Sequence, residues 1–188
     1  MTELSRRGFL KSAFVLTPAL FPQEETLDLT EDNIEGPYYL PNAPWRAEVA
    51  EKAEKGTRIV VAGVVKARNG RPLAEAVLDV WQADATGAYH NDENDDPKVY
   101  RLRSRLKADA KGRYSFETIR PGRYKIGPNR FRPAHIHVKA SKDGYKLLTT
   151  QLYFRDDEIN KVDPWYRPSL ALDPKDGKAE FTVVLAKE

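Results

Sequence analysis

The sequence predicts an all-β protein, an antiparallel β-sandwich with an extended N-terminal arm and little helix. From Thr57 onward, apolar side chains recur with a period of about two, as in strands with one buried face, rather than the period of about 3.6 of a helix. Thirteen prolines and eleven glycines divide the 188 residues into short segments. With 40% hydrophobic residues the chain can form one core, so we expect a single sandwich over residues 57–188, preceded by an arm over residues 26–56.

The expected strands are short, rich in β-branched or aromatic residues, and separated by turn sequences. In chain order they are Arg58–Lys66, Ala76–Trp81, Tyr100–Lys107, Tyr114–Ile119, His135–Ser141, Tyr145–Phe154 and Phe181–Leu185. Asn69-Gly70 is a strong hairpin signal after the first strand, and Pro121-Gly122 marks a later turn. Helix is limited to one turn over Asp156–Asn160.

Residues 1–25 predict an export signal rather than a part of the fold. Paired arginines precede an apolar run of about ten residues, which is too short to span a bilayer stably. The segment Ser5–Lys11, SRRGFLK, resembles the bacterial twin-arginine signal, which is read by a receptor and is not an anchor. We expect export by this route to the periplasm or the outside of the cell, with cleavage near residues 20–26. The alternative is a chance arginine pair in a tail.

Composition excludes several kinds of site. The chain has no cysteine, which excludes disulfides, iron–sulfur clusters, thiolate zinc sites and cysteine nucleophiles. The net charge of +3 is small, and no basic cluster with interleaved aromatic residues marks a nucleic-acid surface. The polar run that follows His90 is expected to be a solvated loop and not a calcium site.

The most informative pattern is the segment FRPAHIHVKA, which holds His135 and His137, two of the three histidines. Residues two apart in a strand point to the same side, so both imidazoles project from one face. By itself, such a pair serves equally well to bind a metal or to complete a polar strand face. No carboxylate follows it on the strand, whereas Tyr89 and Tyr124 stand in neighbouring segments. A deprotonated phenol is a hard anionic donor, which suits Fe(III).

Five sequence blocks, in this order, resemble the intradiol ring-cleavage dioxygenases, the family that includes protocatechuate and catechol dioxygenases. They are GPYY at 36–39, VLDVWQADATGAY at 77–89, GRYSFETIRPGRY at 112–124, RPAHIHVKA at 132–140 and TTQLYF at 149–154. The likeness therefore covers most of the chain after the signal segment. It implies a β-sandwich that carries a non-haem Fe(III) centre.

The resemblance also implies roles for individual residues. It makes the iron ligands two tyrosines and two histidines, Tyr89, Tyr124, His135 and His137. Tyr124 would be the axial phenolate that leaves the metal when a catechol binds. Arg132 and Gln151 would stabilise negative charge that develops on the ring. Pro37 and Tyr38 would line the substrate cavity.

Under this resemblance, the expected reaction cleaves a catechol-type ring between its two hydroxylated carbons with O2 and gives a muconate-type diacid. The partners would be a small aromatic diol and dioxygen, and the family implies a homo-oligomer. Two alternatives stay open. Residues 63–81 and 109–124 also resemble non-catalytic transthyretin-like and carboxypeptidase-regulatory-like binding modules, which do not require the Arg-Pro-x-His-x-His block. A repurposed family member could also bind a metal and act on another substrate.

Overall fold

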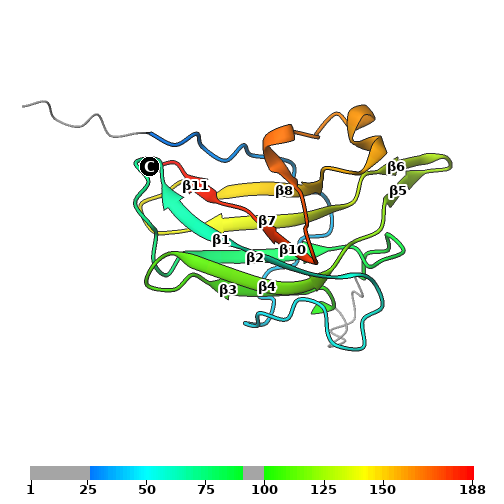
Figure 1. The fold of residues 1–188 in the computed structure, drawn as a ribbon, viewed down its shortest axis with the longest axis horizontal. Helices are drawn as coiled ribbons and strands as arrows, with labels where there is room; N and C mark the ends of the chain where they lie inside the picture. Colours follow the sequence, from blue (N-terminus) through cyan, green and yellow to red (C-terminus); the bar gives the residue numbers. More distant parts are fainter. Residues whose placement is uncertain (1–25, 91–99) are drawn as a thin grey trace, which may run out of the picture.

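The computed structural model describes residues 26–90 and 100–188 as two stacked β-sheets and a small hairpin (Figure 1). The predicted all-β sandwich with little helix is confirmed. Its helical turns in the described part are 3-10 helices, η2 over Glu158–Val162 and η3 over Pro168–Leu170. The predicted twin-arginine signal lies outside the described residues. Within residues 26–90 and 100–188, no helix is long and apolar enough to cross a membrane.

The first sheet is built around strand β1 (Arg58–Ala67). Strand β4 (Arg113–Ile119) pairs antiparallel with one edge of β1. Strands β10 (Lys178–Glu180) and β11 (Val183–Leu185) pair parallel with successive parts of the other edge. The sheet is therefore mixed rather than purely antiparallel.

The second sheet has the strand order β3-β2-β7-β8-β9. Its central strand β7 is antiparallel to both of its neighbours, β2 and β8, and β9 pairs parallel with β8. The five strands are β2 (Val77–Gln82), β3 (Arg103–Lys107), β7 (His135–Ser141), β8 (Leu148–Phe154) and β9 (Ala171–Leu172).

The core lies between the two sheets, because alternate residues of each strand face inward. Strands β1 and β4 contribute Val61, Val65 and Phe116, all fully shielded from solvent. Strand β7 contributes Ile136 and Val138 from the opposite side. Full burial of a side chain of this size stabilises the fold by about 1.5–3 kcal/mol. The residues of β7 that alternate with this pair point to the outer face of the sheet.

The Asn69-Gly70 turn forms, but the prediction of a hairpin between the strands on either side of it was wrong. The Gly70 N–H donates to the Ala67 carbonyl at 2.9 Å, and one bridge joins Lys66 to Pro72. The chain then leaves β1 and enters β2 in the opposite sheet. Both edges of β1 are already paired, with β4 on one side and with β10 and β11 on the other. Long-range pairing therefore decides where β2 lies, and the turn only closes the end of β1.

Other differences concern boundaries and one additional hairpin. The strand predicted from Tyr100 begins only at Arg103, and the strand predicted from Tyr145 begins at Leu148. The additional hairpin consists of β5 (Tyr124–Gly127) and β6 (Arg130–Arg132), and it projects beyond the two sheets (Figure 1). Its glycine, proline and charged residues give no alternation that a sequence pattern would reveal.

Residues 26–56, the predicted arm, run along the edges of both sheets. The Asn33 N–H donates to the Thr149 carbonyl of β8 at 2.7 Å. Further along, the Val49 N–H donates to the Glu117 carbonyl of β4 at 2.8 Å. The segment between these two contacts reaches the outer face of the five-stranded sheet, where the two histidines lie.

Candidate metal centre

Two histidines of β7 lie side by side on the outer face of the five-stranded sheet. His135 and His137 are 3% and 2% exposed, and their ring centroids are 4.8 Å apart. Residues directly opposite one another in antiparallel strands face the same side of a sheet. Trp81 of β2 and Gln151 of β8 stand opposite His137, and the Trp81 ring stacks on the imidazole at 4.6 Å. The imidazoles share one face, as the spacing predicts. Side chains of the neighbouring strands β2 and β8 lie on either side of them.

Tyr89 brings a phenol to both imidazoles. Its Oη lies 3.1 Å from Nε2 of His137 and 3.4 Å from Nε2 of His135. The Nδ1–H of His135 donates to the Pro133 carbonyl at 2.6 Å, so its Nε2 carries the lone pair. Histidines that bind metals commonly anchor the second ring nitrogen in this way.

Tyr124, the first residue of β5, and Tyr38 of the arm complete the aromatic cluster. The two hydroxyl oxygens are 3.0 Å apart and share a hydrogen bond. The Tyr89 ring stacks on Tyr38 at 4.2 Å and meets Tyr124 edge-on at 5.3 Å. Gly36 borders the site, since a Cβ there would lie in ordinary contact, 3.6 Å from Cε1 of His137, and its φ of +70° favours glycine. The arm therefore forms one wall of the site.

The guanidinium of Arg132 is held beside this cluster by several acceptors. Its Nε donates to Asp163 Oδ2 at 2.9 Å, and Nη2 donates to Gln151 Oε1 and Tyr153 Oη, both at 2.9 Å. The Trp165 ring covers one face, with its centroid 4.7 Å from the guanidinium carbon. Arg132 is only 4% exposed, so this cation is both buried and held in a fixed orientation.

Burial and charge set the protonation states of the cluster. Burial, and next the charge of Arg132, lower the pKa of His135 to about 4. Burial also lowers the pKa of His137 well below its ordinary value, and the neighbouring His135 adds to this effect. Burial raises the pKa of Tyr89, and burial with the Tyr38 hydrogen bond raises that of Tyr124 to about 12. At neutral pH the imidazoles are neutral, as metal ligands must be, and the phenols need a cation to become phenolates.

The donor set fits ferric iron. Nowhere in residues 26–90 and 100–188 do three or more histidine, aspartate or glutamate side chains gather as a possible metal site. The cluster instead offers two imidazole nitrogens and two phenol oxygens, one of them within 3.4 Å of both Nε2 atoms. Phenolates are hard anionic donors and imidazole suits iron, so this combination matches Fe(III) better than the softer sites of zinc or copper.

Comparison with known proteins identifies the family. Residues 34–169 match the family profile described as Dioxygenase, which is well over half of the chain. A catechol 1,2-dioxygenase from Candida albicans is 34% identical over 168 residues, which cover 80% of this chain and 55% of that protein. The chain belongs to the intradiol dioxygenase family. A protocatechuate 3,4-dioxygenase beta chain from Burkholderia cepacia is 40% identical over 127 residues, 63% of this chain and 54% of that one. The chain thus spans about half the length of the curated relatives it matches.

Solved structures of dioxygenases share the fold. The dioxygenase domain of a dioxygenase and carbohydrate-binding protein fusion from Streptomyces sp. SirexAA-E is 35% identical, with a TM-score of 0.74 over 86% of this chain and 100% of that one. A 3-chlorocatechol 1,2-dioxygenase from Rhodococcus opacus 1CP is 32% identical, with a TM-score of 0.77 over 85% of this chain and 73% of that one. Family membership favours an enzyme over the non-catalytic binding module that the sequence also resembles.

The residues that sequence reasoning assigned to an intradiol dioxygenase site lie together in the structure. The four predicted ligands, Tyr89, Tyr124, His135 and His137, form the cluster, and Arg132 and Gln151 share a hydrogen bond next to it. Tyr38 contacts two of the predicted ligands, and Pro37 is exposed on the arm beside it.

Two residues that orient Arg132 were missed. Asp163 and Trp165 follow η2 and reach the site from beyond β8. A buried arginine requires a partner, which is the only signal in the sequence, but it does not select one carboxylate among many. The contact depends on the path of the chain after β8, and no local pattern encodes that path.

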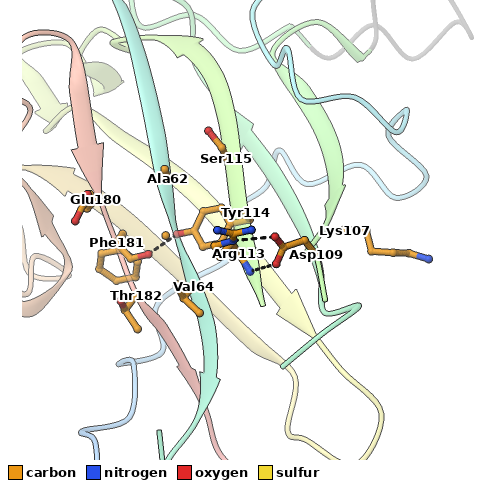
Figure 2. A pocket seen from close by; sticks show the side chains of 11 residues that line it. Ala62, Val64, Lys107, Asp109, Arg113, Tyr114, Ser115, Glu180, Phe181 and Thr182 are labelled. Carbon is orange, nitrogen blue, oxygen red and sulfur yellow. Dashed lines mark hydrogen bonds and ion pairs between the residues drawn. The ribbon is translucent and has the colours of Figure 1, made fainter. Parts of the chain in front are cut away.

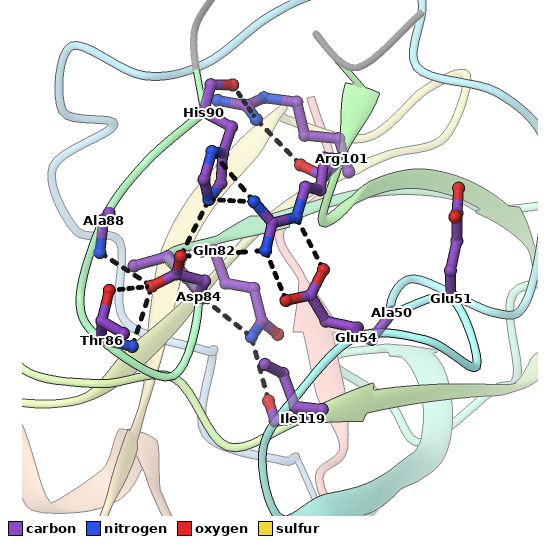
Figure 3. A network of polar contacts seen from close by, with 12 residues as sticks. Ala50, Glu51, Glu54, Gln82, Asp84, Thr86, Ala88, His90, Arg101 and Ile119 are labelled. Atoms are coloured by element: carbon purple, nitrogen blue, oxygen red, sulfur yellow. Dashed lines mark hydrogen bonds and ion pairs between the residues drawn. The ribbon is translucent and has the colours of Figure 1, made fainter.

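His90, which precedes the predicted solvated loop, is held by polar side chains. His90 Nε2 lies 2.9 Å from Asp84 Oδ2, and Arg101 Nη1 lies 2.7 Å from the same imidazole nitrogen (Figure 3). Arg101 in turn donates to both carboxylate oxygens of Glu54, at 2.7 and 2.6 Å. His90, the residue directly after Tyr89, is therefore part of a polar network that also contains Asp84, Arg101 and Glu54. The rest of the polar run, residues 91–96, lies outside the described residues.

Proposed function

We propose that this protein is a non-haem Fe(III)-dependent intradiol dioxygenase. It would cleave a catechol-type ring between its two hydroxylated carbons, incorporate both atoms of O2 and give a muconate-type diacid. The observation that carries the proposal is the convergence of two phenols and two neutral imidazoles beside a buried arginine. The relatives named catechol 1,2-dioxygenase and protocatechuate 3,4-dioxygenase support a catechol-class substrate.

The iron would be held by the cluster residues Tyr89, Tyr124, His135 and His137. When bound, it supplies Lewis acidity and a template for the two catechol oxygens. The protein positions the donors beforehand: the Pro133 carbonyl orients His135, and the Trp81 ring packs flat against His137. Such anchoring keeps donor geometry and lone pairs constant during turnover.

The residues around the cluster would handle protons and charge. As a phenolate, Tyr124 would take up a catechol proton at Oη, and its hydrogen bond with Tyr38 Oη would orient the resulting hydroxyl. Arg132 and Gln151 are preorganised, since each is held by other groups, and they would stabilise negative charge that spreads over the ring. Arg132, Gln151 and Tyr153 are almost fully buried, which excludes water and strengthens these interactions.

Oxygen uptake with a panel of catechols tests the proposal. Iron-loaded protein should consume one O2 per ring opened, and mass spectrometry with ¹⁸O2 should find two labelled atoms in the diacid product. Catechol, protocatechuate, chlorocatechol and hydroxyquinol form the panel. Resorcinol is the matched control, because its two hydroxyl groups are not adjacent and cannot chelate. A protein that stays colourless after ferric loading and consumes no oxygen with any member would overturn the proposal.

We also propose export by the twin-arginine route, to the periplasm or beyond, and a homo-oligomeric state. Paired arginines at residues 6 and 7 support the first proposal, and the family resemblance supports the second. The double variant Arg6→Lys/Arg7→Lys should accumulate inside the cell in a bacterial host, whereas the unaltered chain is recovered outside the inner membrane. Light scattering of the purified protein measures the oligomeric state.

A further inference from the structure

A tight turn built on Asp84 leads directly into Tyr89. The carboxylate Oδ1 of Asp84 accepts the backbone N–H groups of Thr86 and Ala88 at 2.8 and 3.1 Å, and the Thr86 hydroxyl at 2.7 Å (Figure 3). The Asp84 N–H donates to the Ala88 carbonyl at 2.9 Å and closes the turn. Gly87 stands inside the turn with a φ of +88°, a conformation that favours glycine. The turn fixes the backbone that carries the phenol.

The same turn occurs a second time in the chain, at Asp109. The sequence DATGAY at 84–89 matches DAKGRY at 109–114, with a tyrosine five residues after each aspartate. Asp109 Oδ1 accepts the N–H groups of Lys111 and Arg113, both at 2.8 Å. Here the following tyrosine, Tyr114, donates its hydroxyl to the Phe181 carbonyl at 2.7 Å (Figure 2). Tyr114 belongs to β4, and the histidines lie in the opposite sheet. The Asp109 turn therefore serves as a control for substitutions in the Asp84 turn, because it has the same backbone hydrogen bonds but carries a tyrosine outside the histidine cluster.

The Asp84 turn differs in what its other oxygen contacts. Oδ2 of Asp84 meets His90, which leads through Arg101 to Glu54 of the arm. The side chains of Asp84 and Glu54 are only 11% and 7% exposed. The corresponding oxygen of Asp109 accepts a hydrogen bond from the exposed Arg113 side chain of the same turn. The first turn is therefore tied to two other segments of the chain.

The Asp84 turn also packs against the turn that precedes Tyr124. The Gly122 N–H donates to the Asp84 carbonyl at 2.8 Å. A Cβ on Gly87 would lie 2.0 Å from the Arg123 carbonyl oxygen, and a Cβ on Gly122 would lie 2.5 Å from a backbone oxygen of the Asp84 turn. Glycine at both positions, Gly87 and Gly122, allows the two turns to approach this closely. The backbone segments that carry the two phenols are therefore in direct contact.

We infer that Asp84 is a positioning residue for both phenols. Its carboxylate orders the turn before Tyr89. This turn fixes the position of the Asp84 backbone carbonyl, which accepts the N–H of Gly122 in the turn before Tyr124. The spacing of the two hydroxyl groups around the imidazoles thus depends on one aspartate that touches neither of them. The consequence for iron rests on the proposed function, whereas the placement of the phenols does not.

The metal-free protein tests the placement itself. With ring-¹³C-tyrosine, the nine tyrosines give a spectrum small enough to assign. Asp84→Ala should shift the ring signals of Tyr89 and Tyr124 and leave Tyr114 in place. Asp109→Ala should do the reverse. Asp84→Asn keeps the Oδ1 acceptor and should restore most of the wild-type positions. If Asp84→Ala does not fold, Thr86→Val removes a single donor from the exposed side of the turn and should cause a smaller shift of the same two signals.

Iron loading then tests the consequence for the metal. Asp84→Ala should move the visible phenolate-to-iron absorption band and weaken iron binding by about 10- to 100-fold, as removal of an outer-shell partner does. Asp109→Ala should leave both unchanged. Unshifted Tyr89 and Tyr124 signals in a folded Asp84→Ala protein, or in Thr86→Val if Asp84→Ala does not fold, would overturn the inference. Equal effects of the two alanine variants would also overturn it. If wild-type protein binds no iron, the proposed function fails, but the metal-free spectra still decide the role of Asp84.

Discussion

Arg132 and Asp163 form an ion pair that is almost completely shielded from solvent. Nε and Nη2 of the arginine donate to the two carboxylate oxygens at 2.9 and 3.2 Å, and the side chains are 5% and 3% exposed. Nη2 also donates hydrogen bonds to Gln151 and Tyr153. The loop that follows η2 therefore orients a buried cation that contacts Gln151 and Tyr153 beside the predicted iron ligands. Stability and turnover should both depend on this pair.

The variant Asp163→Asn should lower the free energy of unfolding by about 3–5 kcal/mol, because it leaves the Arg132 charge buried without a counterion. Denaturant unfolding at neutral pH measures the loss. Asp156→Asn is the matched control, since Asp156 accepts two hydrogen bonds from Arg120 in an exposed pair. The control should lose less than about 1 kcal/mol. Similar losses in the two variants would contradict a special role for the buried pair.

The variant Arg132→Lys should lower kcat by about 100- to 1,000-fold, the usual effect of removing a preorganised charge-stabilising donor. Lysine keeps the charge but cannot bind Asp163, Gln151 and Tyr153 in one planar arrangement. Oxygen-uptake kinetics and iron content are measured together. Iron content should stay at the wild-type level, and the exposed Arg130→Lys variant should behave as wild type. A parallel fall of iron content and activity would instead mean that Arg132 maintains the metal site.

Ferric loading should give a red-brown protein, because phenolate ligands transfer charge to Fe(III). Chelation should remove colour and oxygen uptake together, and ferric salt should restore both. Tyr124→Phe should shift or bleach the visible band and abolish turnover, and His135→Ala should prevent iron binding. Tyr114→Phe is the control, since it removes a buried hydroxyl of the other sheet and should leave the band unchanged. A Tyr124→Phe protein with the wild-type spectrum would exclude this tyrosine as a ligand.

The stabilising effect of Asp84 should disappear in acid. Burial alone would favour the neutral carboxyl, but hydrogen bonds from Thr86, His90 and the backbone outweigh it and lower the pKa from 3.8 to about 2. A lowered pKa in the folded state stabilises the protein above the unfolded value, and this contribution is lost as pH falls toward about 2. The stability difference between wild type and Asp84→Asn should thus be largest above about pH 4 and shrink below it. A difference that stays constant from pH 5 to pH 2, measured by urea unfolding, would contradict the assignment.

Much of the strand pattern could be predicted because it is local. Alternation along His135–Ser141 correctly placed the two histidines on one face of the strand, and the structure shows that Ile136 lies on the other face, in the core. The pairing of strands was harder to predict. Asn69-Gly70 encodes a turn, but the partner of β1 is decided by which distant strands occupy its edges. For the same reason, the β5–β6 hairpin was missed: its residues carry no alternation, and it exists because Tyr124 and Arg132 pair across it.

The sequence by itself determined the chemistry available to this protein. It contains no cysteine, one His-x-His strand and two tyrosines in family-like blocks, which together favour an iron site of nitrogen and phenol oxygen donors. The tertiary structure alone decided the geometry. Asp163 reaches Arg132 across 31 positions of the chain, and Asp84 anchors the turn before Tyr124 through a backbone contact that two glycines permit. Such contacts depend on how distant segments pack, and side-chain period and turn residues carry no record of that packing.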